Sequence, residues 1–261
     1  MEKQSKTFIE KMIDKQKELI KLYTPIENLP TYPVDITKRP GQKLIKDFVR
    51  RVVEELAEAH ETMSVIYTAM DSNDTTAASN LLDDHNMEIA DTLHFLLETL
   101  IFMGYEDNLR RVFQTLPDML QGLCRNDNPL QSIFSLGGYC NFQQNLHTNR
   151  PGYFEIPMKP KDPNEYPYMG NRKISLSILE DQSVMLWNIT WKLKMMCNEM
   201  RNREWSQEHK ALNITMVETR LAEALVYFGQ YLDYGKFTQI GIYHYYNKKN
   251  AINIERIKKG Y

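Results

Sequence analysis

Apolar residues recur every three or four positions along most of this chain, which is the spacing of amphipathic helices. One such segment spans about 6–23 and a second spans about 42–70. A third, about 81–103, stops at Gly104, a residue type that often follows a helix C-terminus. No alternating pattern of useful length indicates strands, so the sequence predicts an all-α protein.

The same spacing continues towards the C-terminus. A further helix is expected from Gly104 to about Pro117, and three more are expected near 176–203, 207–234 and 237–258. Together these segments predict a helical bundle.

Glycine and proline are concentrated in two stretches. Four prolines lie within 24–40, and twelve of the 22 glycine and proline residues (11 of each) fall between Pro117 and Gly170. Both residue types interrupt helices. We therefore expect a turn in the first stretch and an irregular Gly/Pro-rich insertion at about 118–173, with at most short helices or a small strand pair near Tyr153–Ile156.

The whole chain, 1–261, is expected to form a single all-α domain. It would contain the acidic helices of 42–104, the irregular insertion at about 118–173 and the C-terminal helices of 174–261.

Residues 91–104 resemble residues 223–235: each segment begins with an acidic residue, continues as an apolar helix and ends at glycine. The helix before the first segment contains Glu55 and Glu58, whereas the helix before the second is rich in Lys and Met. A degenerate duplication in which one copy keeps its acids would explain the likeness. The general similarity of any two amphipathic helices would explain it too.

Composition narrows the class of protein. Hydrophobic residues make up 42% and charged residues 25% of the chain, with a formal net charge of −2 and scattered Lys and Arg. This argues against nucleic acid as the main partner and leaves room for a small phosphate-bearing ligand. Three cysteines without ligand-like spacing indicate reduced thiols. No signal-peptide pattern or membrane-length apolar run is visible, so we expect a soluble cytoplasmic protein with no membrane partner.

Two pairs of carboxylates carry the candidate chemistry. Glu55 and Glu58, and likewise Glu88 and Asp91, are three residues apart, so each pair shares one face of a helix. Carboxylate oxygens suit Mg²⁺ or Mn²⁺. An acidic pair on a solvated helix is common, but the second pair lies in a markedly apolar helix, where unneutralised carboxylates are costly.

The C-terminal segment presents a second candidate group. Lys249, Asn253 and Arg256 are four and three residues apart, so one helix face carries an ammonium, an amide and a guanidinium. These donors suit phosphate oxygens. An ordinary basic terminal helix is the alternative interpretation.

Taken in order, these motifs resemble a known family. An E-x-x-E helix, an E-x-x-D-x-x-H-F helix and a terminal K-N-A-x-N-x-x-R-x-x-x-G-Y are similar to those of the all-α nucleotide pyrophosphatase superfamily. Within it, the motifs look most like those of dimeric dUTPases of trypanosomatids and bacteria and of phage dCTP/dUTP pyrophosphatases.

The resemblance implies a role for each motif. Glu55, Glu58, Glu88 and Asp91 would hold Mg²⁺ (Mn²⁺ is possible), and Glu55 or Glu58 would be the catalytic base. The phosphate contacts would come from Lys249, Asn253 and Arg256, and the base or sugar contacts from Gln16 and His94.

The resemblance also implies an activity. We expect a homodimeric hydrolase that converts a deoxyribonucleoside triphosphate, preferably dUTP, to the monophosphate and pyrophosphate. A dCTP, modified-pyrimidine or broad-range pyrophosphatase is one alternative, and a non-catalytic helical nucleotide-binding protein is another.

Overall fold

The computed structural model describes residues 6–113, 153–156, 172–200, 212–235 and 237–260. Its helices are α1 (Phe8–Glu27), α2 (Arg39–Asp71), α3 (Thr75–Met103), α4 (Glu106–Phe113), α7 (Leu176–Glu199), α8 (Ile214–Tyr234) and α9 (Gln239–Lys258). Two four-residue antiparallel strands, β1 (Tyr153–Ile156) and β2 (Arg172–Ser175), are the remaining described elements. The all-α prediction is confirmed, and β1 occupies the residues at which a small strand pair was expected. Apart from Arg172 and Lys173, which begin β2, the rest of the predicted insertion at 118–173 lies outside the described residues.

Four predicted boundaries were wrong, and one of them is the start of the helix expected near 207–234, which begins at Ile214. Helix α1 continues through Pro25 and ends at Glu27, and Asn28, with a left-handed backbone (φ 52°), caps it. Helix α2 begins just before Pro40, since proline is tolerated in a first turn, where its missing N–H has no helical partner. Helix α3 begins at Thr75 because the Asp74 side chain accepts a hydrogen bond from the Ala77 N–H.

The end of α3 follows the prediction. Gly104 adopts a left-handed backbone with φ 76°, and its N–H bonds to the Leu100 and Ile101 carbonyls. Residues without a side chain adopt this conformation at little cost. The chain then turns at once into α4.

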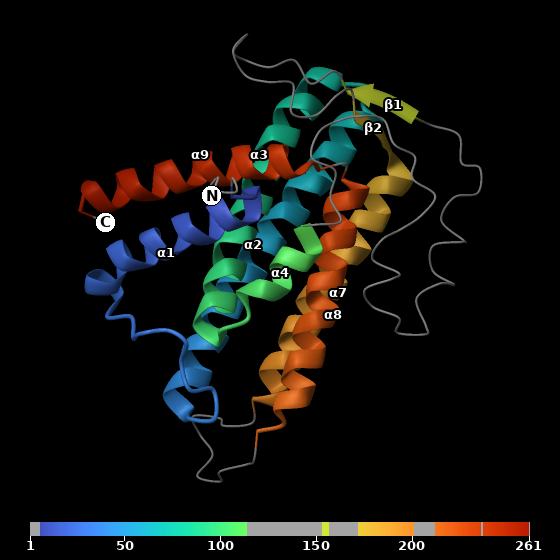
Figure 1. Ribbon diagram of the computed structural model, residues 1–261. Helices are drawn as coiled ribbons and strands as arrows, with labels where there is room; N and C mark the ends of the chain where they lie inside the picture. The colour runs from blue at the N-terminus through green and yellow to red at the C-terminus, as the bar shows by residue number, and fades with distance from the viewer. Residues whose placement is uncertain (1–5, 114–152, 157–171, 201–211, 236, 261) are drawn as a thin grey trace, which may run out of the picture.

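The helices are arranged as two long pairs with a third layer across them (Figure 1). Helices α2 and α3 are joined by the short turn 72–74 and pack along their length, and α7 packs along α8. Helix α9 lies beside α1 and crosses α3, while α7 also contacts α2. The last helix therefore covers one side of the α2–α3 pair.

A continuous buried cluster of apolar side chains includes residues from each of the seven helices that the structure describes. Buried polar contacts join the pairs within it. His85 of α3 lies 1% exposed, with Nδ1 3.0 Å from the Ala59 carbonyl oxygen of α2 and Nε2 against the Tyr231 hydroxyl of α8. Lys46 of α2 donates to the Met200 carbonyl, just beyond α7, at 2.6 Å. These contacts fix the α2–α3 pair against the α7–α8 pair.

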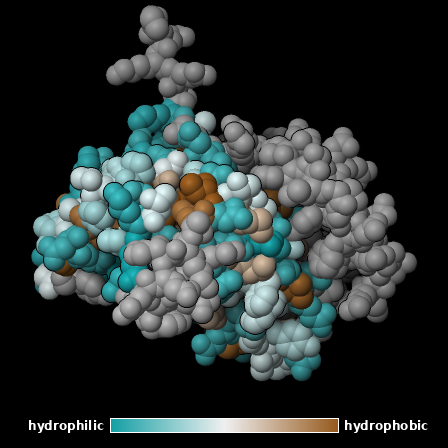
Figure 2. All heavy atoms as spheres, turned by 90° about the horizontal axis from the view of Figure 1, so that it is seen from below, coloured by the Kyte–Doolittle hydropathy of each residue, from teal (hydrophilic) through white to brown (hydrophobic). Residues whose placement is uncertain are grey.

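The surface is mainly hydrophilic in the face drawn in Figure 2, where hydrophobic side chains stand singly between polar ones. Among the described side chains, Trp187 and Trp191 of α7 are 67% and 53% exposed. No helix in the described ranges is both long and apolar enough to cross a membrane.

Candidate metal and phosphate site

The buried stripe of α2 determines how its two candidate glutamates are oriented. Val52, Leu56 and Ala59 are 0–1% exposed and face the core. Glu55 stands three residues after Val52 and four before Ala59, so its side chain leaves the helix beside this stripe and is half-buried. Glu58 lies farther round the helix and is exposed.

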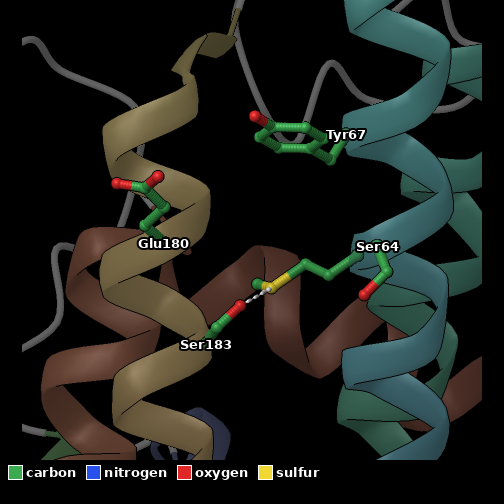
Figure 3. A pocket seen from close by; sticks show the side chains of 5 residues that line it. Ser64, Tyr67, Glu180 and Ser183 are labelled. Atoms are coloured by element: carbon green, nitrogen blue, oxygen red, sulfur yellow. Dashed lines mark hydrogen bonds between the residues drawn. The ribbon is translucent and has the colours of Figure 1, made fainter.

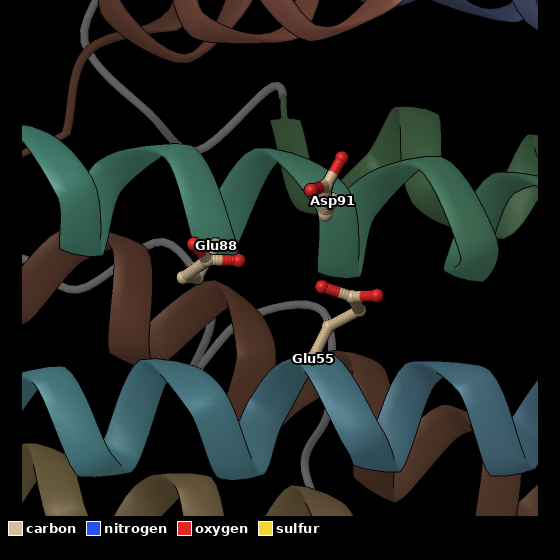
Figure 4. Close-up of side chains that lie close together, drawn as sticks. All are labelled: Glu55, Glu88 and Asp91. Carbon is tan, nitrogen blue, oxygen red and sulfur yellow. The ribbon is translucent and has the colours of Figure 1, made fainter. Parts of the chain in front are cut away.

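Three carboxylates from the two helices converge. Glu55 extends from α2 towards Glu88 and Asp91 of α3 (Figure 4), and one carboxylate oxygen of each lies within 4.8 Å of the others. We call these three residues the acidic cluster. Glu58 is outside this close group, although its charge raises the pKa of each of the three.

Burial and mutual repulsion make the acidic cluster hard to ionise. Burial, followed by the charges of Asp91, Glu58 and Glu88, raises the pKa of Glu55 to about 8. The pKa values of Glu88 and Asp91 are also raised, chiefly by burial, although Lys249 acts in the opposite direction on both. A cation bound between the three would favour their charged forms.

Helix α9 brings one ammonium to the acidic cluster. Lys249 Nζ forms an ion pair with Asp91 Oδ2, and the two side chains are only 14% and 15% exposed. The helix is held in place by neighbouring contacts: the Tyr245 hydroxyl donates to Asp83 Oδ1 at 2.9 Å, and the Tyr246 carbonyl oxygen lies 3.2 Å from His94 Nε2.

Asn253 and Arg256, the other two predicted phosphate contacts, follow Lys249 along α9 towards its C-terminal end. Asn253 is half-buried and Arg256 is exposed. The charge of Arg256 acts to lower the pKa of Asp91, so the guanidinium is within electrostatic reach of the acidic cluster. The structure thus brings the predicted basic face and the predicted acidic helices to one place.

The residues present fit a divalent cation. Three carboxylates from two rigid helices supply hard oxygen ligands at close range. Within the described part of the chain, Lys249 is the one cation in ion-pair contact with them, which leaves a local excess of negative charge when all three are ionised. Mg²⁺ or Mn²⁺ would neutralise that excess.

Gln16 and His94 are brought together, but inside the molecule. They are 0% and 2% exposed, and His94 Nδ1 lies 2.8 Å from Gln16 Oε1. The same Gln16 oxygen accepts a hydrogen bond from the Tyr246 hydroxyl at 2.6 Å, and the His94 ring stacks on the Tyr246 ring with centroids 4.0 Å apart. In this conformation neither side chain faces solvent, and their contact with a nucleobase stays a prediction.

A fourth member of this buried network is Glu98, which the sequence analysis missed. Gln16 Nε2 donates to Glu98 Oε1 at 3.1 Å. Burial raises the pKa of Glu98 to about 8 and lowers the pKa of His94 to about 3, so both are predominantly neutral at pH 7. An acidic residue among the leucines at the end of α3 was the available signal, since such a side chain is buried only when it is paired or neutral.

A charged group on the second helix pair was not predicted from the sequence. Glu223 Oε2 of α8 accepts from Lys192 Nζ of α7 at 3.0 Å and from Arg220 Nη1 at 2.9 Å. We call these three residues the compensated cluster. Burial acts to raise the pKa of Glu223, but the hydrogen bonds from Arg220 and Lys192 outweigh it and the pKa is lowered. The Arg220–Glu223 spacing was visible in the sequence, whereas the contribution from α7 was not.

A shallow pocket elsewhere has no comparable chemistry. It lies between α2 and α7, with Tyr67, Ser64 and Glu180 at its walls (Figure 3). Its one drawn interaction is a contact from Ser183 Oγ to Met63 Sδ at 3.8 Å. Nothing in this lining resembles the convergence of charges between α2, α3 and α9.

Comparison with known proteins adds no relative: no protein-family model, curated protein or solved structure matches the chain.

Proposed function

We propose that this protein is a Mg²⁺-dependent pyrophosphatase of deoxyribonucleoside triphosphates, with dUTP as the first substrate to test. The proposal rests on one observation above the others: the three acidic-cluster carboxylates, within 4.8 Å of one another, meet the basic face of α9 at Lys249. A cation-binding group beside a phosphate-binding group is the combination that hydrolysis of a metal-bound triphosphate needs.

In the proposed reaction, water cleaves the bridge between the α- and β-phosphates, giving the monophosphate and pyrophosphate. Glu55, Glu88 and Asp91 would hold Mg²⁺, with Glu58 at the rim. When bound, Mg²⁺ neutralises phosphate charge and makes a coordinated water more acidic.

The chain's own residues would supply the remaining steps. Glu55 would orient the attacking water and accept its proton, because the bound cation would keep this carboxylate in its charged form. The exposed Glu58 is the alternative base. Lys249, Asn253 and Arg256 would contact phosphate oxygens and stabilise the charge that grows on pyrophosphate as it leaves.

The preference for uracil rests on the resemblance described for the sequence. Gln16 and His94 would read the base or sugar, which requires the nucleoside to approach the network around Tyr246. The same resemblance implies a homodimer, and the mass of the protein in solution tests that part.

The test is pyrophosphate release from the common deoxyribonucleoside triphosphates and diphosphates, with Mg²⁺ and with EDTA. We expect Mg²⁺-dependent release that is fastest for dUTP. Faster release from dCTP or a modified pyrimidine nucleotide would change the substrate within the same class. If the nucleotides raise the melting temperature and none is hydrolysed, the protein is a nucleotide-binding protein and the proposed activity is wrong.

A further inference from the structure

The ion pair between Lys249 and Asp91 carries an inference that rests on the proposed function and goes beyond it. We propose that Lys249 is a displaceable counter-ion: it neutralises Asp91 when no divalent cation is bound, and it is released towards the phosphates when one binds. Lys249 would then couple metal binding to phosphate binding.

The position of the ammonium supports the first half. Lys249 Nζ pairs with Asp91 Oδ2, and Asp91 contributes an oxygen to the group of three that would hold the metal. Side-chain exposures of 14% and 15% place the pair in a partly dry environment, where an ion pair is stronger than at the open surface. A metal that takes this oxygen of Asp91 therefore competes directly with Lys249.

The properties of Lys249 and the anchoring of α9 support the second part of the proposal, the release of Lys249 towards the phosphates. An ammonium is a compact charge on a flexible stem, so it can move without moving its helix. The helix itself is anchored by the Tyr245–Asp83 hydrogen bond and by the stacking of Tyr246 on His94. A Lys249 side chain released from Asp91 stays on the same face as Asn253 and Arg256, the other proposed phosphate contacts.

The acidic cluster and the compensated cluster differ in a way that makes displacement possible. Among the described residues, Glu223 is held by two cations, Lys192 and Arg220. Asp91 is held by one cation and faces two carboxylates. A divalent cation could contact all three carboxylates of the acidic cluster, and only the Lys249–Asp91 ion pair would have to break.

The test measures the dissociation constant for Mn²⁺ by calorimetry, without nucleotide, in wild type, Lys249→Met and Lys248→Met. Lys248 is the matched control, because it is adjacent, carries the same charge and pairs with Asp83 at 3.4 Å outside the acidic cluster. We expect Lys249→Met to bind Mn²⁺ roughly tenfold more tightly than wild type, and Lys248→Met to change affinity less than about twofold.

A variant that keeps the positive charge at residue 249 tests whether substitution at this position alone changes the affinity for Mn²⁺. Lys249→Arg retains a cation at the site and should bind Mn²⁺ within about threefold of wild type. Equal affinities for Lys249→Met and Lys248→Met, or weaker binding by Lys249→Met, would overturn the proposal.

Displacement itself can be observed by NMR. In ¹⁵N-lysine-labelled protein, the Lys249 ammonium signal should move towards that of a solvated lysine as Mg²⁺ is added, while the Lys248 signal stays in place. A Lys249 signal that does not move while Mg²⁺ binds would contradict displacement.

These measurements separate the two proposals. Metal binding with displacement but without pyrophosphate release would sink only the proposed activity. Pyrophosphate release with a stationary Lys249 would sink only the counter-ion role, and no metal binding in any variant would sink both.

Discussion

Both long helix pairs contain partly buried carboxylates, but the charges around these carboxylates differ between the pairs. In the α7–α8 pair, Glu223 is neutralised by Lys192 and Arg220, and its pKa is lowered. In the α2–α3 pair, the acidic cluster keeps three carboxylates together, and their pKa values are raised. In the α7–α8 pair, side-chain cations neutralise the carboxylate. In the α2–α3 pair, negative charge remains in excess, and a bound metal ion would neutralise it.

The internal similarity in the sequence places the contrasting residues of the two pairs at equivalent positions. When residues 91–104 are aligned with 223–235, Asp91 corresponds to Glu223 and Glu88 to Arg220. The partner contributed by the preceding helix is Glu55 in one pair and Lys192 in the other. Two carboxylates in the first pair thus stand where two cations stand in the second. A duplication in which one copy lost its acids would account for this pattern, and so would the general similarity of amphipathic helices.

The largest expected effect separates Asp91 from Glu223. Asp91→Asn removes a proposed metal ligand and should lower kcat/KM for pyrophosphate release by roughly 10³-fold or more, about 4 kcal/mol of transition-state stabilisation. Glu223→Gln changes the equivalent position of the other pair and should leave kcat/KM within about twofold. Steady-state assays on the two folded variants measure the difference.

Glu58→Ala sharpens that result. Glu58 is outside the close group but is a candidate for both the rim ligand and the catalytic base, so alanine should abolish turnover while leaving the helical content intact. Full activity in both Asp91→Asn and Glu58→Ala would contradict the metal assignment.

Next in size is an effect on stability that differs in sign between the pairs. At pH 9 without metal, Glu223→Gln should lower the free energy of unfolding by about 1–2 kcal/mol, because Lys192 and Arg220 lose a charged hydrogen-bond acceptor. Glu55→Gln should raise it, because an ionised Glu55 repels Glu88 and Asp91. Urea unfolding in EDTA measures both, and destabilisation by Glu55→Gln would contradict the predicted repulsion.

The remaining expected effect is a pH dependence of the stability. Glu55 and Glu98 have folded-state pKa values of about 8 against an ordinary 4.5, so the folded protein binds more protons between these values. Metal-free stability should therefore fall as pH rises from about 5 to about 8. Glu223, with its lowered pKa, acts in the opposite direction: its contribution is lost only as pH falls below the ordinary value of 4.5.

Adding Mg²⁺ and substituting Glu98 separate the contributions of Glu55 and Glu98 to this pH dependence. Saturating Mg²⁺ should remove the part due to Glu55, and Glu98→Gln should remove a part that Mg²⁺ does not affect, since Glu98 is buried beside Gln16 and is not part of the acidic cluster. A wild-type protein whose metal-free stability is constant from pH 5 to pH 8 would contradict the raised pKa values.

Most of the helices could be predicted because their signals are local. The apolar spacing of α2 and α3 and the glycine after Met103 are properties of neighbouring residues, and the structure agrees with them. The start of α3 was placed too late because residues 75–79, which are two threonines, two alanines and a serine, show no stripe of large apolar residues. The Asp74 side-chain cap begins the helix there.

The site was predictable only in part, because its contacts join distant segments. Spacing could pair Glu88 with Asp91, and the buried stripe of α2 could have distinguished Glu55 from Glu58. No local pattern indicates that Lys249 meets Asp91 or that Tyr246 meets Gln16, since these contacts follow from the way α9 crosses α1 and α3. The interior position of Gln16 and His94 is a consequence of the same packing.

The most direct test of the acidic cluster is anomalous diffraction from crystals of the protein containing Mn²⁺. An anomalous peak bounded by Glu55, Glu88 and Asp91 is the predicted result, with Lys249 Nζ no longer in contact with Asp91 and no peak beside Glu223. Crystals saturated with Mn²⁺ that show no peak at the acidic cluster, with the Lys249–Asp91 ion pair intact, would contradict the account.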